Sequence, residues 1–169
     1  MQRRRLLKLG LGAAVLIGVA GAGVALIKPG LVDNKLSAAS RELMRAAAHA
    51  VLSDVLPPAG PARDAALDAQ LARLDATIAG LPAATRKELS DALGLLGTAA
   101  GRFALVSLSK PWGQASAADV QQALEAMRLS SSNTKQQIYH ALRDLNAIAF
   151  FAEPDNWKAA GYPGPREIP

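Results

Sequence analysis

The chain has 169 residues, half of them hydrophobic, which is enough for one small domain with its own core. Its formal net charge is +5, but Arg3, Arg4, Arg5, Lys8 and Lys28 carry this excess, and from Pro29 onward 14 basic residues balance 14 acidic ones, which excludes a basic stripe for nucleic acid. There is no cysteine, which excludes disulfides, thiolate-bound iron–sulfur clusters, CxxCH haem attachment and a lipid-modified cysteine anchor.

Residues 1–35 are predicted to be an export signal or a membrane anchor. Two arginines are followed, after one variable residue, by two leucines and a lysine, an order that resembles the twin-arginine motif for exporting folded proteins. Gln2 stands where that motif prefers Ser or Thr. An ordinary secretory signal or an uncleaved anchor with an arginine-rich end is the alternative. The residues that carry the motif are Arg3, Arg4, Leu6, Leu7 and Lys8.

Residues 9–27 contain no polar side chain and are followed by Lys28, Pro29 and Gly30. These 19 residues would span about 28 Å as a helix, close to the hydrocarbon thickness of a bilayer. Positive charge concentrated before the run predicts a cytoplasmic N-terminus and a periplasmic body. We therefore expect a periplasmic protein for which residues 9–27 offer an anchor in the cytoplasmic membrane, and the cleavage of this segment stays open.

Residues 36–151 are predicted to form an all-α domain, a small bundle of about five helices. Apolar residues recur at three- and four-residue spacing throughout this part of the chain. No alternating β-branched runs occur, so no sheet is predicted. The expected helices are 37–55, 62–79, 85 to between 103 and 106, 117–129 and 135–151.

Turn and capping residues set the expected helix boundaries. The proline-rich segment 57–61 forbids continuation of the first helix, and Gly80 is the expected C-cap of the second. The inward positions of the last helix are predicted to include Ile148. Expected helix starts are the Thr85–Glu88 capping box, Ser116 with Asp119, and the serine-rich run 130–134.

No catalytic or metal-binding constellation is predicted. His49 has no histidine or carboxylate one turn away, and His140 has Asp144 at i+4 but no third ligand in its helix. Asp64 and Asp68 lie one turn apart on a helix flank, where solvated charge is the expected role.

The carboxyl-terminal segment 152–169 is predicted to be an irregular docking tail rich in Pro and Gly. Five of the seven aromatic residues fall within the last 31 residues. Tyr139 and Phe150 are expected to pack on the domain's own core, whereas Trp157 and Tyr162 lie in a stretch that cannot form a core by itself. Two uses of this tail remain open, a latch on its own domain and a dock on another protein.

The stretch ALRDLNAIAFFAEPDNWKAAGYPGP, from Ala141 onward, resembles the carboxyl-terminal signature of the small subunits of membrane-bound flavin-dependent dehydrogenases, the gluconate 2-dehydrogenase subunit 3 family. That signature has a helix ending in Ala and two aromatics, then a Pro turn, a Trp and Gly-Tyr-x-Gly-Pro. The aromatic pair is often Tyr-Tyr in the family and is Phe-Phe here. The matching residues are Ala149, Phe150, Phe151, Pro154, Trp157, Gly161, Tyr162, Gly164 and Pro165.

The resemblance implies a non-catalytic accessory subunit with no cofactor in this chain. Such a subunit binds a large flavoprotein of the glucose-methanol-choline type that carries FAD, helps it to mature and supplies its export signal to the twin-arginine translocase. The resemblance also allows a cytochrome c subunit with haem c as a further partner. The alternative is a standalone membrane-anchored periplasmic helical domain with a structural or binding role. The implied partner-binding residues are Phe150, Phe151, Pro154, Trp157, Gly161, Tyr162, Gly164 and Pro165.

Overall fold

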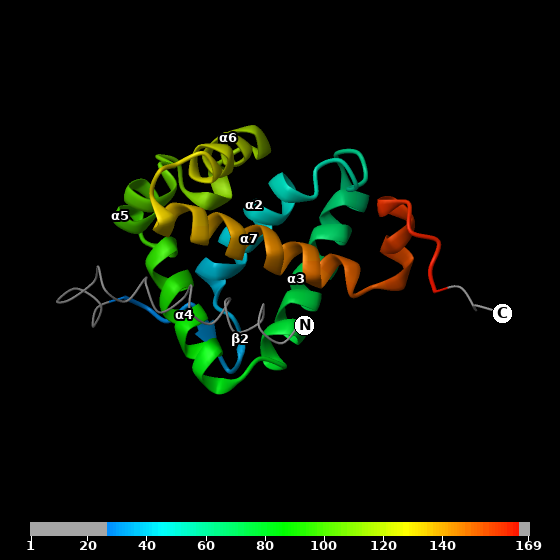
Figure 1. Cartoon of the computed structure of the whole chain (residues 1–169), viewed down its shortest axis with the longest axis horizontal. Helices are drawn as coiled ribbons and strands as arrows, with labels where there is room; N and C mark the ends of the chain where they lie inside the picture. Colours follow the sequence, from blue (N-terminus) through cyan, green and yellow to red (C-terminus); the bar gives the residue numbers. More distant parts are fainter. Residues whose placement is uncertain (1–26, 166–169) are drawn as a thin grey trace.

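The computed structural model describes residues 27–165, which form a mostly helical domain (Figure 1). The long helices are α2 (Ala38–Val51), α3 (Pro61–Ala79), α4 (Ala83–Gly97), α6 (Ala117–Arg128) and α7 (Asn133–Phe151). Short helical turns are α5 (Ala99–Gly101), η3 (Arg102–Val106), η4 (Trp112–Gln114) and η5 (Pro154–Ala160). The mostly helical prediction is confirmed. The proposed export residues Arg3, Arg4, Leu6, Leu7 and Lys8, and the segment 9–26, lie outside the described residues.

Helix α2 lies at the centre and contacts α3, α4, α6 and α7 (Figure 1). Its apolar face follows from the spacing of Leu43, Met44 and Ala47, all three fully buried. The other helices close around it with large apolar side chains that are at most 2 % exposed, namely Leu74, Ile78, Leu93, Val120, Met127, Ile138 and Leu142. Burial of these side chains is the main force that holds a domain without cross-links together.

Most predicted helix boundaries are confirmed, and one cap is wrong. Ser116 and Asp119 form a reciprocal capping box at the start of α6, Ser132 caps α7, and Gly80 is the C-cap of α3. In contrast, α4 starts at Ala83 rather than after Thr85, because the carbonyl of Pro82 already accepts the first helical hydrogen bond.

The third predicted helix is broken rather than continuous. The chain bends by 84° between α4 and the α5–η3 segment. Thr98 is extended at the bend, and its Oγ1 accepts a hydrogen bond from the amide of Gly101 at 3.0 Å, so it acts as the N-cap of a new helical turn. Within residues 27–165 no single helix is both long and apolar enough to span a bilayer; α4 with α5–η3 reaches that length only across this bend.

A two-stranded hairpin that the sequence analysis did not predict precedes α2. Strand β1 (Leu31–Val32) pairs antiparallel with β2 (Lys35–Leu36). Asp33 and Asn34 connect them with φ values of 50° and 60°, the left-handed conformation that two-residue hairpin turns require. The hairpin is tied to α3, because the carboxylate of Asp75 accepts the amide of Leu36 at 2.8 Å.

Helix α7 differs from its prediction in which residues it buries. Ile148, expected to face inward, is 51 % exposed, whereas Asn146 is fully buried. Burial of this amide is compensated, since Asn146 Nδ2 donates to Leu142 O at 2.9 Å and Gln70 Nε2 donates to Asn146 O at 2.9 Å. The inward face of α7 therefore includes a hydrogen-bonded polar contact with α3.

The chain enters the domain across α4 at two glycines. The amide of Gly30 donates to Ser90 O at 3.0 Å, and a Cβ at Gly94 would lie 2.5 Å from the carbonyl oxygen of Lys28. We expect Gly94→Ala to lower the free energy of unfolding by about 1–3 kcal/mol, because backbone atoms must separate. Urea unfolding measures this effect. Gly97→Ala is the matched control, because its Cβ meets only Ala39 Cβ at 3.8 Å; an equal loss in both variants would contradict the account.

Candidate functional site

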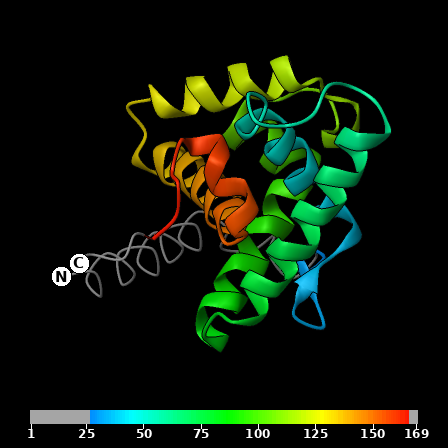
Figure 2. The same ribbon diagram turned by 90° about the vertical axis from the view of Figure 1, so that its right-hand side faces the viewer.

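The carboxyl-terminal tail folds back onto the end of α7. The prediction of an irregular tail is wrong for Pro154–Ala160, which form η5. After a turn, η5 lies beside the end of α7, as Figure 2 shows from the tail side. Two hydrogen bonds fix this position: Trp157 Nε1 donates to Phe151 O at 2.8 Å, and Asn156 Nδ2 donates to Phe150 O at 2.7 Å. Both acceptors are among the last carbonyls of α7, which have no partner within the helix.

The signature glycines turn the chain around the indole ring. Gly161 ends η5 with φ 70°, and the following amide, that of Tyr162, donates to Trp157 O at 3.1 Å. The tyrosine ring then lies beside the indole, with ring centroids 5.5 Å apart. Gly164, with φ 98°, brings the backbone back toward the same indole. Both φ values favour glycine, so the Gly-Tyr-x-Gly spacing has a geometric cause here.

Three of the predicted partner-binding residues lie together where the tail meets the end of α7: the rings of Trp157 and Tyr162 are in contact, and the indole bonds to the carbonyl of Phe151. Phe151 is 38 % exposed, Tyr162 is 49 % exposed, and Trp157 between them is half-buried. We call Phe151, Trp157 and Tyr162 the tail aromatic surface. Pro154 and Pro165 are exposed at either end of the tail.

Phe150 has a different place from its neighbours in the signature. It is only 6 % exposed and packs with Ala48, Leu52 and Leu67, as expected from its apolar spacing. Its ring meets that of Phe151 edge to face at 5.1 Å between centroids. Phe150 thus packs between the core and Phe151. Because Phe150 is buried, contact with a partner would fall to the other residues of the signature.

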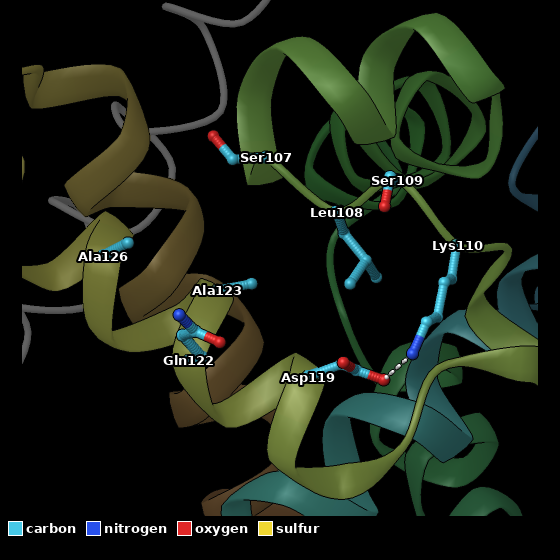
Figure 3. Close-up of a pocket in the computed structure, with 8 residues that line it drawn as sticks. All are labelled: Ser107, Leu108, Ser109, Lys110, Asp119, Gln122, Ala123 and Ala126. Carbon is cyan, nitrogen blue, oxygen red and sulfur yellow. Dashed lines mark hydrogen bonds and ion pairs between the residues drawn. The ribbon is translucent and has the colours of Figure 1, made fainter.

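A shallow hollow lies between the η3–η4 connection and α6 (Figure 3). It measures about 290 Å³ and is lined by Ser107, Leu108, Ser109, Lys110, Asp119, Gln122, Ala123 and Ala126. Lys110 Nζ and the Asp119 carboxylate point toward one another across its edge, 2.8 Å apart. The same carboxylate accepts from the backbone and side chain of Ser116, so its oxygens serve the capping box of α6.

This carboxylate carries a pH prediction. The hydrogen bond from Lys110, aided by those from Ser116, lowers the pKa of Asp119 from 3.8 to about 2. Because the folded-state pKa is depressed, the cap's contribution to stability is present above pH about 4 and is lost as the pH falls toward 2. An NMR titration should show a midpoint near 2, and Lys110→Gln should move it upward. A wild-type midpoint near 3.8 would contradict this geometry.

Asp64, Asp68 and His49 each lie in an ion pair or a hydrogen bond with an arginine. Asp64 and Asp68 both contact the guanidinium of Arg45, at 2.9 and 2.5 Å, and their side chains are about 70 % exposed. His49 Nε2 lies 3.2 Å from a guanidinium nitrogen of Arg63. The pKa of His49 is lowered, mainly because the ring is partly buried and next because the Arg63 charge is near. Between residues 27 and 165, no group of three or more histidine and carboxylate side chains is arranged to hold a metal ion.

Comparison with known proteins gave no relatives: no family model, no curated protein and no solved structure matches this chain.

Proposed function

We propose that this chain is a non-catalytic accessory subunit that binds a large FAD-dependent dehydrogenase of the glucose-methanol-choline type, helps it to mature and exports it to the periplasm. The observation that carries the proposal is the tail aromatic surface, built at one end of the domain from residues of the signature. Phe151, Trp157 and Tyr162 offer the large aromatic area on which binding energy concentrates in protein interfaces.

The geometry of the tail favours binding to a partner at low cost. The indole N–H is already bonded to Phe151 O at 2.8 Å, so covering the ring leaves no unsatisfied donor. The side chains of Trp157 and Tyr162 are also held by their mutual contact, which reduces the rotamer entropy lost on association. The contacts that hold the tail on α7 would therefore also hold its aromatic side chains ready to bind the partner.

The proposal divides the chemistry between chains. The large subunit would hold FAD and oxidise the substrate, and a cytochrome c subunit with haem c would receive the electrons. This chain would supply the twin-arginine address at Arg3 and Arg4 for a partner that folds around its cofactor in the cytoplasm. In this proposal the tail binds the dehydrogenase and the arginine pair directs the resulting complex to export.

Purification of the tagged full chain from its source cells in mild detergent tests this proposal. We expect a large second protein to elute with it in a constant ratio, and the eluate to show the absorption bands of oxidised flavin, with haem bands where a cytochrome subunit is retained. An eluate that contains the chain alone, as a monodisperse species without flavin, would contradict the proposal and favour the standalone membrane-anchored domain.

A further inference from the structure

The end of the domain opposite the tail carries an exposed apolar corner. It is formed where the chain bends after α4, and we define the α5 corner by its exposed residues Ala99, Ala100, Phe103 and Ala104. The side chain of Phe103 is 68 % exposed, so this corner presents a large apolar group at the surface. Figure 1 shows this corner and η5 at opposite ends of the molecule.

Acidic side chains are missing from the sequence around this corner. Residues 92–109, which contain it, hold Arg102 but no Asp or Glu, whereas Lys110, which follows them, is paired with Asp119. Residues 27–32 hold one charged side chain, that of Lys28. The start of α7 adds a further cation nearby, because Lys135 Nζ lies 3.4 Å from Ser107 Oγ at the end of η3. An apolar tip with a basic surround suits a surface of anionic lipid headgroups.

The described chain begins against α4, one turn before the bend that forms the corner. Residues 27–30 cross α4 at Gly94, one turn before its end. The amide of Gly30 donates to Ser90 O and the amide of Leu31 to Ser90 Oγ, each at 3.0 Å. The 26 residues that precede the described chain include all but the last residue of the apolar run 9–27, and this crossing follows the run directly. The crossing brings backbone close to backbone, so the domain holds the chain from residue 28 onward, directly after the predicted run 9–27.

We propose that the α5 corner rests in the headgroup region on the periplasmic face of the cytoplasmic membrane. The inference rests on the anchoring part of the proposed function, and it adds an orientation to it. Phe103 inserts among the lipids beside the anchor, and the tail aromatic surface points away from the bilayer toward the periplasm. A partner held at the tail would then stand off the membrane by the length of this domain.

Spin labelling of the full chain in vesicles of phosphatidylethanolamine and phosphatidylglycerol tests this orientation. The chain has no cysteine, so Phe103→Cys and Ala159→Cys each give one nitroxide site. Position 159 is exposed on η5 and serves as the matched control at the opposite end. We expect the ratio of collisions with oxygen to collisions with a water-soluble nickel complex to be several-fold higher at position 103 than at position 159.

Each outcome decides the inference. Equal ratios at the two positions on vesicle-bound protein would overturn the orientation and leave the anchor intact. Dipolar broadening at position 103 would overturn it in favour of contact with a second copy. A full chain that does not stay on vesicles would overturn the anchor and the corner's role together. Flavoprotein capture in detergent is measured separately, so its failure is distinguishable from all three.

Discussion

A variant that carries both Trp157→Ala and Tyr162→Ala is expected to lose most of its capture of the large flavoprotein. These side chains form the centre of the tail aromatic surface, with ring centroids 5.5 Å apart. Buried interface aromatics contribute about 2 kcal/mol or more each, so the loss of both corresponds to binding that is roughly several hundredfold weaker or more. The amount of flavin eluted per mole of tagged chain measures the effect.

The matched control removes exposed apolar side chains elsewhere. Val32 is 53 % exposed and Leu129 is 68 % exposed, so Val32→Ala with Leu129→Ala removes two exposed apolar side chains away from the tail. This control should capture the flavoprotein as the wild type does. The tail variant should remain folded, because the bonds of Trp157 involve only the end of α7. Undiminished capture by the tail variant would refute the docking role.

The largest stability effect is expected at Trp112. Its ring is 4 % exposed within the main core, and its Nε1 donates to Leu96 O at 2.9 Å. That carbonyl is among the last four of α4, so the indole satisfies an acceptor that the helix cannot. Trp112→Ala should lower the free energy of unfolding by about 3–5 kcal/mol, a large share of the total for a small domain.

Urea unfolding of a graded pair tests this role. Trp112→Phe retains most of the buried aromatic area but removes the donor and part of the ring, so its loss should be smaller than that of Trp112→Ala, about 1–3 kcal/mol. A loss below about 1 kcal/mol for Trp112→Ala would show that η4 and the end of α4 separate from the core independently of global unfolding.

The long helices could be predicted because their signals are local. Apolar spacing located α2, α3, α6 and α7 to within a few residues, and the Ser116–Asp119 box marked the start of α6 correctly. The bend after α4 could not be derived in this way, because Thr98 follows a helical apolar pattern without interrupting it. The hairpin was missed although Asp33-Asn34 is a turn signal, because each of its strands has only two residues.

The candidate site was predictable in composition but not in geometry. The sequence indicated that Trp157 and Tyr162 do not belong to a helical core. Their mutual contact depends on the left-handed conformation of Gly161, and the latch depends on which α7 carbonyls lie within reach of η5. Those features follow from tertiary packing. The α5 corner could not be predicted from the sequence either, because the bend at Thr98 creates it.

The central claim is that this chain carries the export address for a partner that holds the cofactor. Fractionation of cells that express the chain with Arg3→Lys and Arg4→Lys tests it most directly, because the charge is kept and only the arginine pair is lost. We predict that the flavin-containing dehydrogenase then accumulates in the cytoplasm, whereas the wild-type chain delivers it to the periplasm. Equal periplasmic flavoprotein with both chains would contradict the account.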